Sequence, residues 1–388
     1  MNPEARSMFD PKLYAKVLRP PLQAEPLPGW CYTSEEFYRR EIERVFSRNW
    51  ICIGREDTLP RVGDYRAFEF CGKKLILVRA SENKINLLDN VCRHRGTLLL
   101  TGSGNTNVIL CPFHHWGYGL DGMLRGAPAM EQTEGFRKSD YGLQAYEVSL
   151  WNGFIFARLI PGGPSLEEAM GDMDGLVASY KMSDMTCARQ KVFTVACNWK
   201  LFIEVFMEDY HLKAVHKSSI AGTYTAPEPL ERLNGDFATI FNPHQGTSAL
   251  LTGEQHLALP PIEGLVGKAA AGTRYLFFYP SFAYACTIDC MWFFEIYPEG
   301  PSRTRVAMNM CFPRSTVARK DFAEKFAAYE QRWDVSMKED LVVLELQQQG
   351  LETDQYSPGR LSHLEPVVGM FANWLIRHAV EMPRDARS

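Results

Sequence analysis

The chain lacks long apolar runs, a surplus of basic charge and a dense set of cysteines. Its most apolar stretch, residues 275–297, is interrupted by Pro280, Asp289 and Glu295, so it cannot supply the roughly 20 consecutive apolar residues that span a bilayer. With 42 basic and 46 acidic residues the net charge is -4, which excludes the basic footprint of a nucleic-acid binder. Ten cysteines in 388 residues are too sparse for a disulfide scaffold, and no basic leader with an apolar core opens the sequence. We therefore expect a cytoplasmic protein that binds neither a membrane nor nucleic acid.

The chain is long and apolar enough to form two folded domains. It has 388 residues, of which 46% are hydrophobic, and a domain usually holds about 100–200 residues. Residues 1–30 are rich in proline, which predicts an arm on the surface of a larger body. The next segment, residues 34–46, has a capping serine, early acids and apolar residues at helical spacing. We assign residues 1–44 to an arm and a helix that pack on the larger domain.

The two domains differ in their residue patterns. Residues 45–160 form short alternating or apolar runs separated by glycine, which predicts an all-β domain. A Pro-Gly-Gly-Pro sequence that begins at Pro161 suits neither a helix nor a strand and marks the linker. Residues 161–388 mix helical and strand patterns, so the whole chain is assigned to the α+β class. The segments expected there are helices at 166–180, 198–215 and 316–349, a strand at 191–196, and three antiparallel strands at 274–280, 282–297 and 303–313.

The predicted β domain contains a first group of candidate metal ligands. Cys92 and His94 are separated by one residue, Cys111 and His114 by two, and sixteen residues lie between the two pairs. Each pair follows an apolar run and precedes glycine or proline, which predicts two neighbouring loop tips. Two thiolates can hold one iron of a [2Fe-2S] cluster while two neutral imidazoles hold the other, which raises its reduction potential. The spacing therefore indicates an electron-accepting iron-sulfur cluster.

A Cys2His2 zinc site is the main alternative for these four residues. Zinc modules usually open with two cysteines separated by two to four residues, whereas each loop here carries one cysteine and one histidine. The iron-sulfur interpretation is therefore favoured. We expect His115 to be a packing or surface residue and not a fifth ligand.

The larger domain contains a second group of candidate metal ligands. His211 and His216 are five residues apart, which on an ideal helix separates their side chains by about 140°. Both reach one metal only if the helix ends or widens between them, and we predict such an irregularity. Glu208, three residues before His211, should share its face and lie beside it. Two histidines and one carboxylate on one side of a metal are typical of non-heme Fe(II) oxygenases.

The chemistry of the residues leaves the third ligand open. Carboxylates on predicted helices are usually solvated, so no candidate stands out by its chemistry alone. A pair of structural, hydrogen-bonded histidines is the alternative interpretation of His211 and His216. A metal site is favoured because a redox cluster in the same chain needs a destination for its electrons. The eligible acids are Asp209, Glu339, Asp340 and Glu345.

The loops around Cys92 and Cys111 resemble the Rieske signature, and the chain is similar to the large (alpha) subunit of Rieske non-heme iron oxygenases. The similarity extends to Glu339-Asp340 and to residues 348–360, which resemble the end of the family's catalytic domain. The resemblance implies a helix-grip catalytic domain with an antiparallel sheet. It implies a [2Fe-2S] cluster on Cys92, His94, Cys111 and His114, and a mononuclear Fe(II) on His211, His216 and Asp340.

The same resemblance implies partners and an electron route. In the family, the cluster of one subunit of a homotrimer approaches the iron of its neighbour, and a carboxylate at the position of Glu208 bridges the histidine ligands of the two centres. O2 is the co-substrate, and NAD(P)H supplies electrons through a separate flavin/iron-sulfur reductase. This chain has no GxGxxG fingerprint of its own. It departs from the common family form at Phe113, where tyrosine is usual, and at His115, where glycine is usual.

The sequence favours one class of substrate but does not identify the compound. A glutamate at position 208 is familiar in members that oxidise quaternary ammonium compounds, so we favour hydroxylation or oxidative demethylation of a small organic substrate of that type. An aromatic stripe in the predicted sheet offers faces for a cation, although such a stripe is more often core. Its seven members are Tyr275, Phe277, Tyr279, Phe282, Tyr284, Trp292 and Phe294. The alternatives are a cis-dihydroxylating or hydroxylating dioxygenase of an aromatic compound, and an electron-transfer Rieske protein without oxygenase activity. We expect Asn198 to line the iron site, and Trp199 and Lys200 to make packing and surface contacts.

Overall fold

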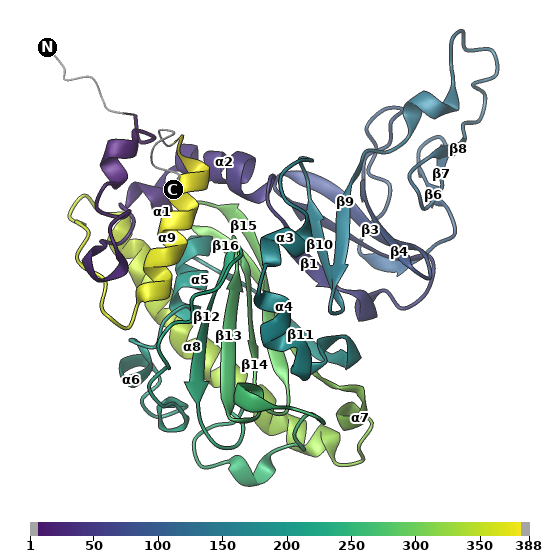
Figure 1. The fold of residues 1–388 in the computed structure, drawn as a ribbon. Coiled ribbons are helices and arrows are strands. Elements are labelled where there is room, and N and C mark those ends of the chain that lie inside the picture. Colours follow the sequence, from purple (N-terminus) through teal and green to yellow (C-terminus); the bar gives the residue numbers. More distant parts are fainter. Residues whose placement is uncertain (1–6, 382–388) are drawn as a thin grey trace, which may run out of the picture. The chain divides into compact units, whose positions relative to one another are not determined.

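The computed structural model describes residues 7–381, so the first six residues of the predicted arm lie outside the described part. The chain divides into two compact units (Figure 1). One is Trp50–Gly163, and the other combines the described residues up to Asn49 with those from Pro164 onward. The expected borders, after residues 44 and 160, lie a few residues away. The N-terminal arm thus belongs to the same unit as the C-terminal part of the chain.

The unit Trp50–Gly163 is built from antiparallel sheets, as its sequence pattern predicts. Its seven-stranded sheet has the order β1-β10-β9-β4-β3-β2-β5, and a three-stranded sheet has the order β6-β7-β8. The strands are β1 (Ile51–Arg55), β2 (Asp64–Phe70), β3 (Lys73–Ser81), β4 (Lys84–Asp89), β5 (Ser103–Asn105), β6 (Ile109–Leu110), β7 (Gly117–Tyr118), β8 (Leu124–Gly126), β9 (Ala145–Trp151) and β10 (Phe154–Arg158).

Local sequence explains the tightest hairpin of this unit. The loop between β2 and β3 is only Cys71-Gly72, and both residues have positive φ, 52° and 71°. This is the two-residue turn whose twist matches that of antiparallel strands. The apolar core beneath includes Ile76, Val78 and Leu88, and it continues to Cys92 and Cys111. The core therefore reaches the predicted cluster loops.

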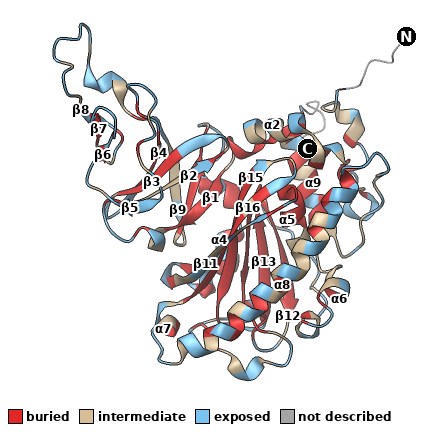
Figure 2. Ribbon diagram, turned by 180° about the vertical axis from the view of Figure 1, so that it is seen from behind, coloured by how far each residue is buried: buried red, intermediate tan, exposed pale blue. Residues whose placement is uncertain are grey.

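The larger unit contains a six-stranded antiparallel sheet with the order β11-β16-β15-β14-β13-β12. The four predicted strand segments are confirmed, with 191–196 at the end of the longer β11 and the run 282–297 divided into β14 and β15. Strand β12 was not predicted. The sheet is buried along most strands, and α8 lies across it (Figure 2). The ring of Trp333 on α8 packs edge-on against Trp292 of the sheet, with centroids 5.7 Å apart. The strands are β11 (Met185–Val195), β12 (Phe237–Pro243), β13 (Gly272–Phe278), β14 (Phe282–Cys286), β15 (Met291–Gly300) and β16 (Arg303–Pro313).

The helices of the larger unit correct several expectations. The predicted helix 198–215 is interrupted, and the predicted helix 316–349 is a short helix followed by a thirty-residue one that ends just beyond Gly350. A last helix was not predicted. The described helices are α1 (Trp30–Thr33), α2 (Glu35–Glu41), α3 (Leu166–Met170), α4 (Met173–Val177), α5 (Trp199–Phe206), α6 (Leu212–Val215), α7 (Arg314–Val317), α8 (Phe322–Leu351) and α9 (Pro366–Ala379), with a π-helical turn at Ile42–Phe46.

The expectation that Lys200 makes surface contacts is wrong. Its side chain is fully buried, and its Nζ lies 2.8 Å from Oε1 of Glu41 on α2. The same carboxylate accepts a hydrogen bond of 3.1 Å from the indole N–H of Trp199, which is packed as expected. A buried ion pair satisfies both charges, which explains how a lysine is retained in the core. This pair joins the N-terminal helix to α5.

Two further features concern the cysteines and the length and apolarity of the helices. All ten cysteines are free of disulfide bonds. Within residues 7–381, no helix has both the length and the apolarity needed to cross a bilayer.

Candidate metal centres

The two predicted cluster loops are closed by their own backbone hydrogen bonds. In the first, the N–H of Cys92 donates to the carbonyl of Thr97 and the N–H of Gly96 donates to the carbonyl of Cys92, at 2.8 and 3.0 Å. In the second, the N–H of Cys111 donates to the carbonyl of Trp116 at 2.8 Å. A β-bridge between Val91 and Leu98 flanks the first loop, and β6 and β7 flank the second. Each cysteine-histidine pair therefore lies at the tip of a hairpin.

The four side chains of these loops are arranged by polarity. Cys92 and Cys111 are buried, whereas His94 and His114 are exposed. The two imidazole rings are 4.7 Å apart, and Trp116 stacks on His94 with an interplanar angle of 13°. Buried thiols with outward imidazoles match the donor set of a [2Fe-2S] cluster held by two cysteines and two histidines.

The surroundings of the Cys111 thiol favour a thiolate ligand. Burial raises the pKa of the Cys111 thiol, but hydrogen bonds from the backbone N–H groups of Phe113 and His114 outweigh burial, so the pKa lies below its ordinary value. Cys92 Sγ lies 3.3 Å from the hydroxyl of Tyr118. Hydrogen bonds to the charged form of a ligand stabilise it and tune the metal.

Position 115 has a backbone conformation that favours glycine, although this chain has a histidine there. His115 has a φ of 56°, in the left-handed region where glycine is favoured. Its side chain is exposed, in agreement with the expectation of a surface residue. Phe113 packs on the ring of His114, with centroids 3.7 Å apart. Both departures from the common form therefore lie next to a histidine of the cluster loops.

The second group of candidate ligands is positioned by a break between two helices. Asn198 caps α5, which ends at Phe206, and α6 begins only after His211 and ends just before His216. The predicted irregularity is confirmed, since the two histidines flank a four-residue helix. Their rings are 5.1 Å apart. Glu208 lies beside His211 as expected, through a tight turn in place of a continuous helix.

The long helix α8 brings a carboxylate to the two histidines. Asp340 Oδ1 lies 2.9 Å from Nε2 of His216 and 3.7 Å from Nε2 of His211. One donor atom from each of the three residues lies within 4.8 Å of the others. Asp340 Oδ1 is buried and has no hydrogen-bond partner in the structure. A buried carboxylate oxygen without a partner is costly, so this arrangement fits a cation at the centre of the three donors.

Two more carboxylates fix the orientation of the histidines. Glu208 Oε1 lies 2.6 Å from Nδ1 of His211, and Glu339 Oε2 lies 2.7 Å from Nδ1 of His216. Glu339 also accepts a hydrogen bond of 2.6 Å from the hydroxyl of Ser219. A carboxylate at Nδ1 places the proton there and leaves Nε2 free to bind a metal.

The four acids considered as third ligand are now distinguished by position. Only Asp340 among them has an oxygen in the described donor group. Asp209 accepts a hydrogen bond of 2.6 Å from the side chain of Asn242, and Glu345 accepts one of 3.2 Å from the backbone of Ala196. Glu339 supports His216. Its role was missed because the spacing of His216 and Glu339 in the sequence carries no signal.

The carboxylates around His211 raise the pKa of its imidazole. Burial lowers the pKa of His211, but the hydrogen bond and charge of Glu208, with a contribution from Asp340, outweigh burial and raise it. Metal binding to a histidine requires the neutral ring, so a metal held by His211 would compete with protons.

A small cavity with an aromatic wall adjoins the three donors. It encloses about 50 Å³ of free space. Of the seven aromatic residues proposed from the sequence, all are buried, and Tyr275, Trp292 and Phe294 line this cavity. The stripe is therefore core at some positions and cavity wall at others. The other aromatic lining residues are Phe206, Tyr224 and Trp333.

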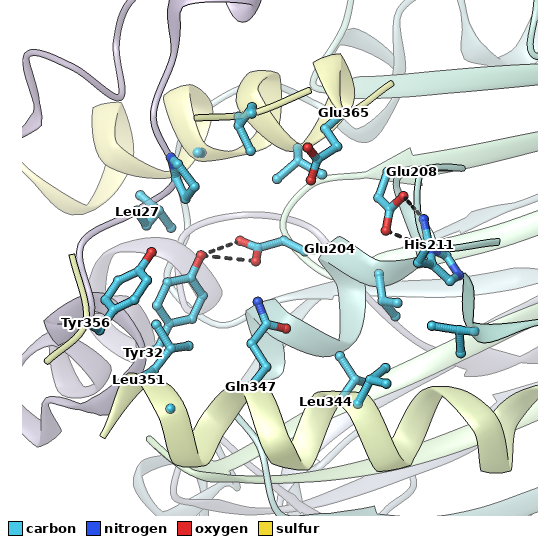
Figure 3. Close-up of a pocket in the computed structure, with 18 of the residues that line it drawn as sticks. Leu27, Tyr32, Glu204, Glu208, His211, Leu344, Gln347, Leu351, Tyr356 and Glu365 are labelled. Carbon is cyan, nitrogen blue, oxygen red and sulfur yellow. Dashed lines mark hydrogen bonds and ion pairs between the residues drawn. The ribbon is translucent and has the colours of Figure 1, made fainter. Parts of the chain in front are cut away.

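A larger cavity of about 630 Å³ lies beside the other edge of His211 (Figure 3). Glu208 and His211 are at one end of it, and Tyr32 donates to both oxygens of Glu204 further along, at 3.0 Å each. Asn198 is not among the described residues that line either cavity. Its side-chain amide instead donates to the carbonyls of Tyr32 and Pro301, so the expectation that it lines the iron site is not supported.

Two family matches together cover most of the chain. Residues 182–381 match the family described as ring hydroxylating alpha subunit (catalytic domain), and residues 49–147 match the Rieske [2Fe-2S] domain. The first match spans more than half of the chain, which therefore belongs to the ring-hydroxylating alpha-subunit family. It is a Rieske-type oxygenase subunit, an enzyme whose family carries a Rieske [2Fe-2S] cluster and a catalytic non-heme iron.

Curated relatives of the chain include monooxygenases of choline and of glycine betaine. The chain is 27% identical over 380 residues to chloroplastic choline monooxygenase of Spinacia oleracea, with 95% of this chain and 80% of the relative covered. It is 24% identical to the glycine betaine monooxygenase oxygenase subunit of Pseudomonas aeruginosa, strain UCBPP-PA14, with 90% and 88% covered. Its homologues are thus oxygenase subunits of quaternary ammonium monooxygenases.

A solved structure shows the same fold. The crystal structure of a quaternary ammonium Rieske monooxygenase in complex with L-carnitine superposes with a TM-score of 0.78 at 22% identity, and covers 94% of this chain and 97% of that chain. The predicted α+β fold class is confirmed. The alternative of an electron-transfer protein without oxygenase activity is wrong, because the catalytic domain of an oxygenase is present. Oxygenase subunits of this kind work with a separate reductase.

Proposed function

We propose that this oxygenase subunit hydroxylates or oxidatively demethylates a small quaternary ammonium compound at iron held by His211, His216 and Asp340. The observation that supports it most is the unpartnered Oδ1 of Asp340, which faces both Nε2 atoms beside an aromatic cavity. The proposed ligands of the cluster are Cys92, His94, Cys111 and His114.

The reaction consumes two electrons and two protons for each O2. One oxygen atom would enter a C–H bond of the substrate and the other would leave as water, and iron held by these residues would supply the centre for activating dioxygen. The residues of this chain hold and orient the reactants. Glu208 and Glu339 keep the protons of the two histidines on Nδ1. The buried aromatic wall excludes water and offers π faces to a methylated cation.

Glu208 is proposed as the carrier of the electron route between subunits. Its carboxylate contacts His211 on the edge opposite the donor group, and it lines the larger cavity. Glu208 also lines the smaller cavity, so it lies between the two cavities and beside a proposed iron ligand. A homotrimer, with a flavin/iron-sulfur reductase that draws on NAD(P)H, and a cytoplasmic location complete the proposal.

Oxidation of an aromatic compound is the second candidate function. The aromatic lining that suits a methylated cation also suits an aromatic ring, since edge-to-face contacts stabilise both core and ligand rings. The two candidates differ in their products. Oxidation of an N-methyl group releases formaldehyde, whereas cis-dihydroxylation keeps both oxygen atoms in a diol.

A substrate panel distinguishes these functions. The purified subunit is reconstituted with its iron-sulfur cluster and its mononuclear iron and is supplied with NADH and a surrogate reductase. O2 uptake is then recorded with quaternary amines and with aromatic compounds. We expect substrate-dependent uptake and formaldehyde or a hydroxylated amine with the former. Uptake only with aromatic compounds, with diol products, would replace the first candidate by the second.

A Glu208→Gln variant should keep its iron and lose roughly 10–100-fold in turnover.

A further inference from the structure

Arg332 places a buried positive charge in the wall of the substrate cavity. It lies on α8 eight residues before Asp340, so the two Cα atoms are about 12 Å apart along the helix axis. Arg332, Ser336 and Asp340 follow one another at intervals of four residues and all line the cavity. The Arg332 side chain is only 4% exposed. The cavity therefore has the three candidate metal donors at one end and the guanidinium of Arg332 at the other.

Arg332 differs from the other buried basic residues of the described chain. A buried charge is costly unless it is paired, and buried basic residues normally have a carboxylate partner. Arg332 has no carboxylate oxygen within 4.0 Å among residues 7–381. The five other buried basic side chains each form an ion pair: Arg55 with Asp57, Arg79 with Glu56, Arg158 with Glu147, Lys200 with Glu41 and Arg274 with Glu231.

The contacts of the Arg332 guanidinium are all with neutral groups. It donates to the carbonyl of Ser248 at 3.2 Å, to the hydroxyl of Ser336 at 3.3 Å and to the hydroxyl of Tyr224 at 3.2 Å. Its carbon lies 5.2 Å from the ring centre of Trp292. These hydrogen bonds are longer than the charge-assisted bonds of about 2.7–2.9 Å that a guanidinium forms with a carboxylate. The group is positioned but lacks a counter-ion.

The acids of the cavity wall are already engaged elsewhere. Glu208 contacts His211, Asp209 accepts from Asn242, and Asp340 faces the two histidines. Near Arg332 the polar groups are instead the phenols of Tyr224 and Tyr275, which are hydrogen-bonded to each other. Phenol hydroxyls and a guanidinium are all hydrogen-bond donors. The end of the cavity away from the metal is thus arranged to receive an acceptor with negative charge.

We propose that Arg332 binds an anionic group of the substrate, so that this oxygenase acts on a carboxylate-bearing compound. The proposal rests on the proposed function and narrows it. The guanidinium holds the carboxylate through its planar fork, and the carbon to be oxidised extends toward the three metal donors. A methylated ammonium group with a carboxylate a few bonds away satisfies both ends. A cation that ends in a hydroxyl leaves Arg332 unpaired and adds a like charge.

Binding requires the cavity to widen. Its free space of about 50 Å³ is enough for one or two water molecules and too small for such a substrate. Met308 and Met337 line the cavity, and their unbranched side chains adopt alternative rotamers readily. The anion site is retained in this movement because Arg332 is fixed at one side by Ser248 and Ser336.

Matched substrate pairs test the proposal. Glycine betaine and choline differ in a carboxylate against a hydroxymethyl group, and benzoate and benzyl alcohol differ in the same way. We expect the acid of the pair that is oxidised to exceed the alcohol by about 100-fold or more in kcat/KM, because an unpaired buried donor rejects the analogue that lacks its partner. Which pair is oxidised tests the proposed function, and the preference within the pair tests Arg332. Equal use of acid and alcohol overturns the role of Arg332.

Three variants separate recognition from folding. Arg332→Met should raise KM for the acid about 100-fold and leave the alcohol unaffected, while Arg332→Lys should restore part of the preference because it keeps the charge. Arg274→Met is the control, since Arg274 is equally buried but is paired with Glu231 and lies outside the cavity lining. Its acid-to-alcohol ratio should be that of the unmodified chain.

Iron content, melting temperature and calorimetric binding of the acid to the inactive, unreduced protein are measured for each variant. If Arg332→Met retains iron but loses activity towards the acid and the alcohol by the same factor, the proposal is contradicted. If Arg332→Met does not fold, Arg332→Lys carries the test. An unchanged acid-to-alcohol ratio and unchanged acid binding in the lysine variant overturn the proposal, because the bidentate fork is lost there.

Discussion

The two candidate metal centres of this chain are assembled in opposite ways. The four cluster donors lie between residues 92 and 114, on two hairpin loops that close through their own backbone hydrogen bonds. The three proposed iron donors lie on either side of α6 and on α8, and Asp340 is far from His211 in the sequence. A local site can form wherever its hairpins form, whereas a site built from distant helices depends on the packing of the whole unit.

The histidines of the two candidate centres also differ in their exposure to solvent. The cluster histidines are exposed, while the imidazoles of the iron site are largely buried and each has its own carboxylate. The segment that leads to His211 is α5, whose first turn is joined to α2 by the buried pair of Lys200 and Glu41. We therefore expect the iron site to be sensitive to distant substitutions to which the cluster is indifferent.

Removing one ligand from each centre should have the largest effect. His211→Ala should abolish turnover and mononuclear iron while the visible absorption of the cluster persists, because the cluster donors lie in the other unit. His94→Ala should remove that absorption and leave iron binding at His211 unchanged. Metal analysis and visible spectra measure both. Loss of both metals in either variant would show that the centres are not independent.

Breaking the buried ion pair of Lys200 and Glu41 should destabilise the larger unit and leave the stability of the other unit unchanged. Lys200→Met leaves Glu41 buried and uncompensated, which should cost about 3–5 kcal/mol in the larger unit. Denaturant unfolding followed by tryptophan fluorescence measures this loss, and the cluster absorption at low denaturant should be unaffected. Lys191→Met is the control, since Lys191 pairs with Asp334 at the surface and its loss should cost about 1 kcal/mol or less. Equal effects of the two variants would contradict a structural role of the buried pair.

A smaller effect should follow from loosening one iron ligand. Glu339→Gln weakens the support at Nδ1 of His216, so iron should bind roughly 10–100-fold more weakly, with the cluster intact. Iron titration in the presence of a competing chelator measures the change. Glu345→Gln, on the same helix but bonded to the backbone of Ala196, should bind iron as the unmodified chain does. If both variants bind iron equally, Glu339 does not position the ligand.

The contrast between the centres also explains how much could be predicted. The cluster loops and most strands follow from local patterns, because spacing, β-branched runs and turn residues act over a few positions. Asp340 could not be selected from four acids without the position of α8 against α6. The burial of Lys200 was missed because lysine is usually exposed and its partner Glu41 is distant. The helix α9 was missed because Pro366 suggests a break, although proline is well tolerated in the first turn.

A last predicted effect is a pH dependence confined to the larger unit. Burial raises the pKa of Glu204 to about 8, an effect that the hydrogen bond from Tyr32 only partly offsets. In the unfolded chain this carboxyl titrates near its ordinary value of 4.5. Between these pH values the folded unit keeps a proton that the unfolded chain has released. Its stability therefore falls as pH rises through this window, by at most about 1.4 kcal/mol per pH unit for this group.

Glu204→Gln should remove this contribution because an amide does not titrate, while its carbonyl still accepts the hydrogen bond from Tyr32. From pH 5 to pH 8 the melting temperature of the variant should rise relative to that of the unmodified chain. Asp289, whose pKa burial raises to about 6, contributes a slope of the same sign, but it is present in both proteins and cancels in the difference. Parallel pH profiles would show that Glu204 is already ionised in the folded unit. The larger cavity would then hold an additional negative charge close to Glu208 and His211.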